Sequence, residues 1–587
     1  FRQAWLVVLP AVLPVLDLAP WTGRFFFDES DLFLLVSCGV ALLLAPHPQA
    51  GRYLSRRTLV LGGFFAATTL LALLVGLLPL SPLDANSFSS YFSHYNALRV
   101  AKGFAWGLGF FLLLRWTVPA KAELPARLFT TGILLGLLGV ILIGLWERSQ
   151  YAGLLDFSVP YRITASFSSM HTGGSHLPAF LALAIPFIWL WVVRRRDVIS
   201  LLGGLALFSG SVYLMMSTVT RAGILALVVQ LLLLGLLWLR ALQQRGRGGM
   251  ASALALLVMI GGTGSVLLLG SQSSFLQQRL STVEQDAQTR LDHWSLAYRM
   301  MDEGPATSLF GMGLGTFPET FLFKNPSAQV PGNFRYASEG DNTYLALGAG
   351  ETLYLAQRVA VEPNTRYRLS FEMRGEGKRL QLTIPLCEKH LLNSRDCVWK
   401  SYQAEGRKGW QQVAADLNSG DIGGTWLHTP PVELFLYNAE PGQVVEVDNL
   451  SLRAPDGSEL LRNGDFSAGG DHWFFKTHEH LAWHIKNLWV SLLFEQGWAG
   501  LLAFNLFLLA VTIQLGRQAW AGNAIPAATL TALIGFLTLG LFASPFDAPR
   551  LTSLFFAVTA LGLHATPWLT ARGPSPRPGS QPHRSPD

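Results

Sequence analysis

The residues best suited to chemistry stand where a long polar segment meets an apolar one, in residues 478–500, HEHLAWHIKNLWVSLLFEQGWAG. If the run from His484 onward is helical, four polar side chains line one face of that helix: His484, Asn487, Ser491 and Glu495. Such a stripe must face protein or water, because an ionisable group in hydrocarbon costs several kcal/mol. The segment therefore suits a reaction between a lipid-borne substrate and a soluble one.

Two side chains of this segment are candidates for a general base. The imidazole of His484 titrates near neutral pH without help. Lys486 would need a pKa lowered by burial or by a cationic neighbour, and on such a helix it projects about 100° away from Asn487. We predict His484 as the base, with Lys486 as a phosphate or headgroup contact beside Asn487, and His478 and His480 as nearby alternatives.

Three arginines on the same predicted side of the membrane are candidates to hold phosphate: Arg162, Arg221 and Arg290. A guanidinium there can pair bidentately with phosphate oxygens, or it can simply snorkel to the interface. The position of Arg221, in a VTRAG corner between two apolar segments, by itself favours snorkelling. His171 and His176 follow Arg162 without a cluster of carboxylates, so we predict no metal site.

The composition indicates a membrane protein with a soluble part. Half of the 587 residues are hydrophobic and only 14% are charged, against about 25% in globular domains. The net charge of +6 comes without a basic cluster interleaved with aromatic residues, so no nucleic-acid partner is expected. About twelve apolar segments are candidates to span a lipid bilayer, namely residues 4–20, 31–46, 58–80, 99–117, 127–146, 177–193, 198–217, 221–239, 252–270, 485–516, 525–545 and 551–568.

Basic residues predict the orientation of these spans. With the N-terminus inside, alternate loops hold the arginine and lysine clusters, as the positive-inside rule requires: Arg52, Arg56 and Arg57, then Lys121 and Arg127, then Arg194, Arg195 and Arg196, then Arg240, Arg245 and Arg247, and then Arg517. Both termini are then cytoplasmic. Residues 81–96, 147–176, 218–221, 271–483 and 544–550 face the other side.

The chain divides into five parts. Residues 1–270 hold nine spans, and residues 271–325 read as an amphipathic helix followed by a glycine-rich turn, GMGLGTF. From 326 to 475 the apolar period changes to two, which predicts a jelly-roll-like β-sandwich. Residues 476–570 hold the end of the loop and three more spans, and residues 571–587 form a tail expected to be disordered.

The predicted β-sandwich carries three features with two interpretations each. Cys387 and Cys397 form a disulfide in an oxidising compartment or remain thiols. Asp448 and Asn449 bind calcium or form Asx turns. Three tryptophans stack on sugar rings or belong to the core: Trp399, Trp410 and Trp426.

Taken together, the motifs resemble those of the bacterial O-antigen ligase and polymerase family. The resemblance rests on the TRAG corner at Arg221, an R-x3-W step at Arg290, the GMGLGTF segment, and H-x-x-N-x9-G opening a span at His484. It covers the membrane part, about two thirds of the chain. Where the family commonly has H-x-H-N, this sequence has His484-Ile485-Lys486-Asn487. The predicted β-sandwich, which looks like a carbohydrate-binding module, is unusual in the family.

The resemblance implies a metal-independent, inverting glycosyltransferase of the bacterial inner membrane, without a cofactor. Such an enzyme transfers a glycan from undecaprenyl pyrophosphate to a sugar hydroxyl of another repeat or of lipid A-core, on the periplasmic side. The resemblance assigns the pyrophosphate to Arg221 and Arg290 and the base to the histidine at the mouth of the last-loop helix. A polysaccharide flippase and a membrane-anchored glycan sensor are the alternatives, and the sequence does not separate polymerase from ligase.

Overall fold

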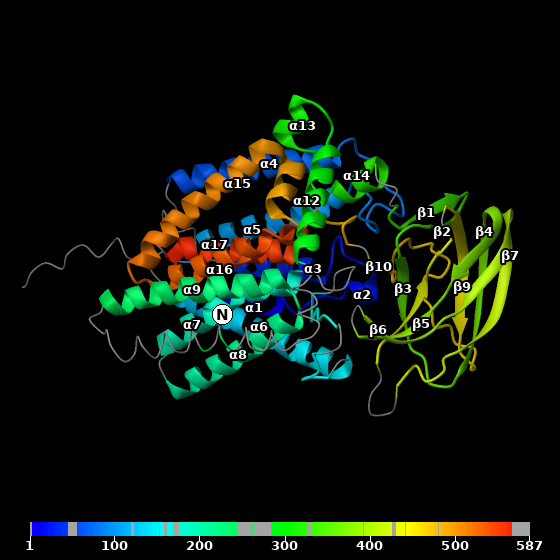
Figure 1. Cartoon of the computed structure of the whole chain (residues 1–587), viewed down its shortest axis with the longest axis horizontal. Helices are drawn as coiled ribbons and strands as arrows, with labels where there is room; N and C mark the ends of the chain where they lie inside the picture. The colour runs from blue at the N-terminus through cyan, green and yellow to red at the C-terminus, as the bar shows by residue number, and fades with distance from the viewer. Residues whose placement is uncertain are drawn as a thin grey trace, which may run out of the picture.

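The computed structural model describes residues 3–44, 56–118, 123–151, 153–157, 161–167, 175–195, 197–244, 261, 264, 283–326, 330–390, 393–424, 430–440, 442–478 and 480–565. Within these ranges a body of helices is joined to a β domain at one end (Figure 1). Four predicted features lie outside the described residues: the span 252–270 except residues 261 and 264, the loop around His171, Trp426, and the tail 571–587.

Seven helices of the described ranges are long and apolar enough to cross a membrane: α4 (Arg56–Leu77), α5 (Asn96–Thr117), α6 (Leu124–Tyr151), α7 (His176–Arg195), α8 (Val198–Ser217), α9 (Arg221–Gln244) and α15 (Leu488–Trp520). Shorter helices accompany them: α1 (Trp5–Val12), α2 (Ala19–Thr22), α3 (Glu29–Leu43), α16 (Ala524–Gly540) and α17 (Pro549–Ala565), with a 3-10 turn, η1 (Pro545–Asp547). The chain is thus a multi-pass helical membrane protein. The expected span 4–20 is divided between α1 and α2, and a count of twelve spans is not established.

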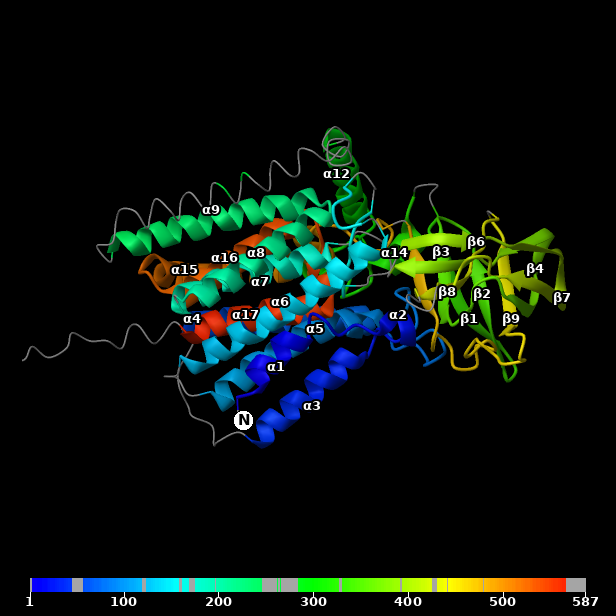
Figure 2. The ribbon, with the colours of Figure 1, turned by 90° about the horizontal axis from the view of Figure 1, so that it is seen from below.

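The long helices run along the long axis of the molecule, in both views (Figures 1 and 2). The centre of the bundle contains α7 and α16, most of whose residues are buried. Small side chains allow the two backbones to approach closely, as membrane helices require in the absence of a hydrophobic driving force: Ala179, Ala182 and Ala184 on α7, and Ala527, Ala528 and Ala532 on α16.

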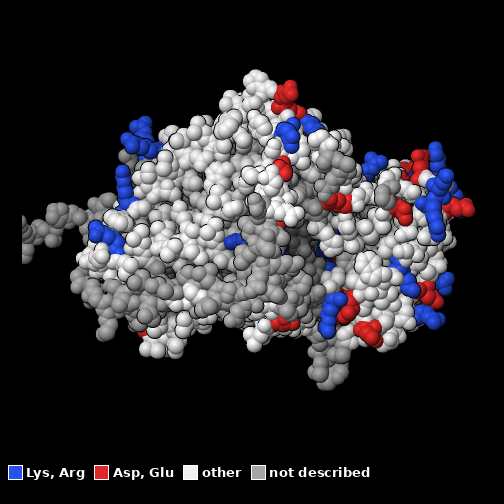
Figure 3. All heavy atoms as spheres, in the orientation of Figure 1, with Lys and Arg blue, Asp and Glu red and all other residues white. Residues whose placement is uncertain are grey.

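Basic residues gather at the end of the helical body that lies away from the β domain (Figure 3). Arg56 begins α4 there, and Arg115, Arg194 and Arg517 lie in the last turns of α5, α7 and α15. Between that end and the β domain the visible surface is mainly uncharged. This distribution matches a segment of the molecule that sits in lipid.

Three further helices connect the membrane helices to the β domain: α12 (Val283–Arg299), α13 (Pro305–Phe310) and α14 (Phe317–Lys324). Of these, α12 crosses the long helices near the β domain (Figures 1 and 2). Residues 271–282 lie outside the described ranges, and the described part of the predicted segment holds these three helices, separated by turns, where one helix and one turn were expected.

The β domain consists of two antiparallel five-stranded sheets, in the orders β1-β2-β9-β4-β7 and β10-β3-β8-β5-β6. The strands are β1 (Asn333–Glu339), β2 (Asn342–Gly348), β3 (Leu353–Val359), β4 (Arg366–Thr383), β5 (Leu386–His390), β6 (Asn393–Val398), β7 (Ser401–Asn418), β8 (Val432–Leu436), β9 (Val444–Arg453) and β10 (Phe474–Thr477). The predicted alternation on β4 is confirmed, because every second side chain is buried in the core between the sheets: Tyr367, Leu369, Phe371 and Met373. The inserted two-sheet domain was therefore readable from the sequence.

The structure describes the cysteine pair, the Asp448–Asn449 pair and two of the three tryptophans of the β domain. Cys387 and Cys397 form a disulfide between paired positions of β5 and β6. The carboxylate of Asp448 accepts hydrogen bonds from the backbone N–H of Asn449 and from the amide of Asn342, each at 2.7 Å. An Asx turn would instead bond the N–H two residues on, so neither interpretation of this pair is confirmed. Trp399 is exposed, whereas Trp410 lies under the guanidinium of Arg374, 4.3 Å from its ring centroid.

Aromatic rings and backbone hydrogen bonds join the β domain to the helical body. Phe475 of β10 packs against Tyr91 and Trp483, with ring centroids 5.3 Å apart in both pairs. The side chain of Asn86 bonds the backbone of Tyr336 on β1 in both directions, at 2.7 and 2.6 Å. The last of these rings, Trp483, precedes His484, so this junction holds the β domain next to the predicted site.

Candidate functional site

The helix at the predicted site begins at Leu488, not at His484 as expected. Asn487 has extended backbone angles, φ −155° and ψ 124°, and its side-chain oxygen accepts hydrogen bonds from the backbone N–H groups of Trp489 and Val490. Lys486 has a φ of +60°, in the left-handed region. A helix therefore cannot extend back through these two residues, and Asn487 is its N-cap. The expected common face is wrong for His484, which lies in the loop before α15.

His484 is nevertheless buried and oriented by a carboxylate. Its Nδ1 lies 2.7 Å from Oδ2 of Asp547, and the two side chains are 7% and 16% exposed. Burial lowers the pKa of His484, and the hydrogen bond to Asp547 opposes that shift. A proton on Nδ1 shared with the carboxylate leaves the lone pair on Nε2, which is the arrangement of a general base.

Asp547 is fixed in turn by Arg99, a residue of α5. The guanidinium of Arg99 donates from Nη1 to the backbone oxygen of Asp547 at 2.7 Å and from Nε to the side chain of Asn96 at 2.7 Å. It also stands over the ring of Tyr91 at 4.0 Å and is 5% exposed. Burial of an arginine among such partners holds the η1 turn against α5.

The loop between α16 and α17 connects three of the six predicted site residues. The backbone oxygen of Leu541 accepts from the Asn487 side chain at 2.9 Å, and that of Phe542 accepts from Nη1 of Arg290 at 2.8 Å. Two residues later, the hydroxyl of Ser544 lies 2.9 Å from that of Ser491 on α15. This loop, with Asp547 at its end, brings Arg290, Asn487 and His484 together.

Helix α12 contributes three residues spaced so that they share one side of the helix. Asp286 forms an ion pair with Arg221, Arg290 reaches Phe542, and Nε2 of His293 lies 3.1 Å from the backbone oxygen of His484. The side of α12 that carries Arg290 therefore also touches the TRAG corner and the segment that holds His484.

Arg162, the third arginine predicted to bind phosphate, lies at the TRAG corner. Nε of Arg162 donates to the backbone oxygen of Thr218 at 3.1 Å, and Thr218 caps the end of α8. Arg221 begins α9 at the same corner, with its side chain 28% exposed. The two arginines are held by different partners at the same end of the bundle.

Several of the predicted site residues lie near His480. It lies within electrostatic range of Lys486, His484, Arg162 and Arg290. His176, at the start of α7, lies within the same range of His484 and Lys486. Five of the six predicted site residues thus gather at one end of the bundle, with Lys486, Arg162 and Arg290 as the cations near His480 and His484. Arg221 is tied to them through Asp286.

A glycine-rich turn supports the far side of the site. The non-helical backbone of Gly497, φ 63° and ψ −168°, kinks α15. The carbonyl groups of Phe494 and Glu495 accept instead from the backbone N–H groups of Met312 and Gly313, at 2.8 and 3.0 Å. The carboxylate of Glu495 accepts from Gly315 N–H at 2.9 Å. The GMGLG segment thus occupies a helix kink, as a structural turn would.

Residues that the sequence did not single out complete the site. Asp547 and Arg99 orient His484, and Arg550 pairs with Asp17 at 2.7 Å beside the backbone of Ser166. The sequence signal for Asp547 and Arg550 was their place in the short polar loop 544–550, predicted to face the same side as His484. Arg99 gave a weaker signal, a cation one turn into a mainly apolar helix that also holds Lys102.

Comparisons with known proteins leave the family open. Neither the scan against protein-family models nor the search of curated proteins found a match. Within the described residues, no group of three or more histidine, cysteine, aspartate or glutamate side chains is arranged to hold a metal ion. The site as described can accept a proton at His484, can stabilise the imidazolium through Asp547, and offers several cations to an anionic substrate.

Proposed function

We propose that the protein is a glycosyltransferase that moves a glycan from undecaprenyl pyrophosphate to the hydroxyl of an acceptor sugar. The observation that carries this proposal is the buried His484–Asp547 pair at the end of a membrane helix bundle. The neighbouring His480 lies within electrostatic range of His484, Arg162 and Arg290. Displacement at an anomeric carbon needs a base for the attacking hydroxyl and cations for the leaving diphosphate. The candidate site offers both within one region.

In the proposed reaction, Nε2 of His484 removes the proton of the acceptor hydroxyl as its oxygen attacks the anomeric carbon. The bond from that carbon to the diphosphate oxygen breaks, and its electron pair leaves with the diphosphate. Arg290, Arg221 and Arg162 neutralise the growing negative charge, and Lys486 adds a further cation. Asp547 stabilises the imidazolium and is a positioning residue. Attack opposite the leaving group inverts the anomeric centre, and no metal or cofactor is required.

The proposal places this end of the molecule in the periplasm of a bacterium, with the helices in the inner membrane and both termini in the cytoplasm. Support comes from the arginines that gather at the opposite end of the bundle, because cytoplasmic loops carry an excess of Lys and Arg. The β domain, which has an exposed Trp399, is proposed to handle the glycan chain. That role favours a polymerase of O-antigen or exopolysaccharide over a ligase.

The test is to incubate the purified protein in detergent or vesicles with a lipid-linked repeat, first alone and then with lipid A-core. A ladder of products with the first substrate marks a polymerase, and a single shift with the second marks a ligase. The absence of any transfer with either acceptor, from protein that is folded and monodisperse, would contradict the proposed function and favour a flippase or a glycan sensor.

A further inference from the structure

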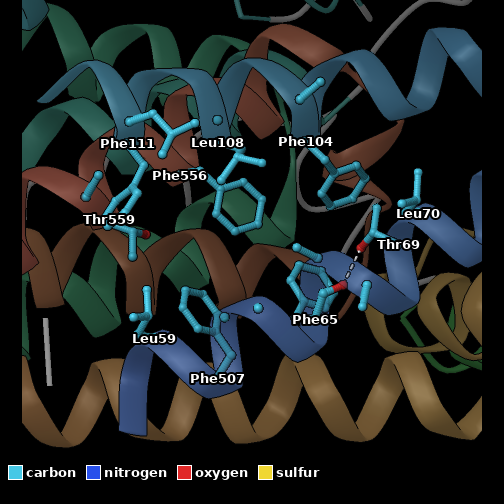
Figure 4. A pocket seen from close by; sticks show the side chains of 18 of the residues that line it. Leu59, Phe65, Thr69, Leu70, Phe104, Leu108, Phe111, Phe507, Phe556 and Thr559 are labelled. Carbon is cyan, nitrogen blue, oxygen red and sulfur yellow. Dashed lines mark hydrogen bonds between the residues drawn. The ribbon is translucent and has the colours of Figure 1, made fainter. Parts of the chain in front are cut away.

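A long apolar groove runs between helices α4, α5, α15 and α17 (Figure 4). Its volume is about 570 Å³, within the range of ligand-binding cavities. Small residues of α4 and α5 make room for it, among them Gly63, Ala67 and Ala105, and Figure 4 shows phenyl rings that line the space. The lining is almost entirely hydrocarbon, so a polar ligand has nothing to bind there.

The groove is elongated along the membrane normal. Its lining extends from Thr58 to Leu73 on α4 and from Ala101 to Arg115 on α5. At 1.5 Å per residue, these stretches are each roughly 21–23 Å long, most of the hydrocarbon thickness of a bilayer, about 30 Å. The shape therefore fits an extended hydrocarbon chain rather than a compact ligand.

The groove is also accessible from the side. Three leucines that line it are among the exposed side chains of the helical body: Leu59 at 48%, Leu70 at 57% and Leu108 at 50%. In a bilayer these side chains face lipid, because the helices that carry them are long and apolar enough to cross it. A chain can thus enter laterally from the membrane.

One end of the groove adjoins the candidate site. Phe104 and Phe556, which line the groove, both pack on Phe546, with ring centroids 5.4 and 5.9 Å apart. Phe546 precedes Asp547, the partner of His484. Nearby, the hydroxyl of Thr69, also in the lining, donates to the side chain of Gln496 at 3.4 Å. A lipid chain in the groove would therefore end next to the site around His484.

We infer that the groove seats the polyprenyl chain of the lipid-linked donor and so holds its diphosphate at the arginines. This inference rests on the proposed function for the identity of the lipid. The nearness of the groove to the site, across Phe546, favours this occupant over an acyl chain of a bilayer lipid, since an acyl chain in bulk membrane has no reason to end there. The groove accordingly selects the donor by its chain, separately from the recognition of its sugar.

The test compares two glycine substitutions that differ only in their position relative to the groove. Gly63 lines the groove, and a Cβ added there meets no atom within 4 Å, so Gly63→Leu fills groove space without a backbone clash. Gly109 of α5 has the same open surroundings but is not part of the lining, so Gly109→Leu is the matched control. Each variant is reconstituted in vesicles of phosphatidylethanolamine and phosphatidylglycerol.

The vesicles carry a polyprenyl diphosphate with a diazirine on its chain or, in a second arm, a phosphatidylcholine with a diazirine on its acyl chain. We expect the first probe to label residues of the groove, and unlabelled polyprenyl diphosphate to displace it. Gly63→Leu should lower this labelling at least about tenfold, the factor that corresponds to about 1.4 kcal/mol, whereas Gly109→Leu should leave it unchanged.

Labelling by the acyl probe that matches the polyprenyl probe, without displacement by polyprenyl diphosphate, would overturn the inference and mark the groove as a seat for bilayer lipid. Equal labelling of the Gly63→Leu variant and wild type would also overturn it, whether or not glycan transfer is observed. Displaceable labelling in a protein that transfers no glycan would instead support the groove and contradict the proposed function, so the two failures are distinguishable.

Discussion

At His484 the hydrogen bond to Asp547 decides which ring nitrogen can accept a proton. The donor is Nδ1 at 2.7 Å from the carboxylate, so the lone pair resides on Nε2. Asp547 is itself held by Arg99 through its backbone oxygen. The basicity of the imidazole therefore depends on two residues, Asp547 and Arg99, that lie far from His484 in the sequence and meet it only in the folded chain.

Replacing Asp547 by asparagine should slow transfer on the order of a hundredfold, the lower range of general acid–base contributions. The amide removes the negative charge that stabilises the imidazolium, and it should lower the pKa of His484 further, because the bond to Asp547 raises that pKa. Single-turnover rates across pH measure both effects. Asp471→Asn, on the β domain, is the control. An unchanged rate with an unchanged pH profile in Asp547→Asn would exclude a positioning role.

The pH dependence of the unmodified protein has a defined direction. Burial lowers the pKa of His484, so the neutral, proton-accepting form persists to a lower pH than for a histidine in water. We expect transfer to remain constant as pH falls through about 6.5, the ordinary value, and to decline only below it. A profile from pH 4.5 to 8 checks this, and a half-maximal rate above about 6.5 would contradict it.

At the scale of elements, the kink of α15 is the feature that positions the site. Gly497 has a φ of +63°, and a Cβ there would lie 2.4 Å from the backbone of Leu309. The GMGLG turn fits against the kink and bonds the carbonyl groups that the helix leaves open. A residue with a side chain at this position would force apart α13, α15 and the turn.

Gly497→Ala should accordingly destabilise the fold, since a left-handed backbone alone costs an L-residue about 1–2 kcal/mol and the contact with Leu309 adds to that. Thermal unfolding in detergent measures the change as a lower midpoint. Gly516→Ala, on the same helix, is the control: its Cβ approaches only Leu530, at 4.0 Å, and alanine in a helix interior gains about 0.5–1 kcal/mol over glycine. Equal midpoints for the two variants would refute the role of the kink.

The sequence predicted the elements whose signal lies within one element. It did not predict features that depend on contacts between distant segments. The alternation on β4 and the apolar runs of α4 to α9 follow from periodicity, which acts within one element. The start of α15 at Leu488 did not follow, because the left-handed backbone of Lys486 and the capping bonds of Asn487 depend on the surrounding chain. Asp547, Arg99 and Arg550 were missed as partners because hydrogen bonds and ion pairs between distant segments leave no spacing signal.

In the whole molecule, a periplasmic site requires the β domain and the arginine-rich ends of the helices to lie on opposite sides of one membrane. The seven long helices and the mainly uncharged surface between the two ends are consistent with that arrangement. The junction of Phe475, Tyr91 and Trp483 then holds the β domain directly over the site.

Single cysteines test this arrangement in a chain whose Cys38 is replaced by serine; the disulfide-bonded Cys387 and Cys397 do not react. We expect an impermeant maleimide to label Ser458→Cys on the β domain in cells with a permeabilised outer membrane. It should label Glu123→Cys, just before α6, only after the inner membrane is opened. Both positions are exposed. Labelling of both cysteines before the inner membrane is opened would contradict the predicted topology.

The most direct test of the central claim measures polyprenyl diphosphate released per glycosidic bond formed, for the wild type and for His484→Ala, with a purified lipid-linked donor. We expect one polyprenyl diphosphate released per glycosidic bond formed in the wild type. In the variant we expect a loss of both products on the order of a hundred- to ten-thousandfold, while His478→Gln, an exposed histidine of the same segment, stays near wild type. Diphosphate release and bond formation at wild-type rates in His484→Ala would contradict the role of His484 as the base.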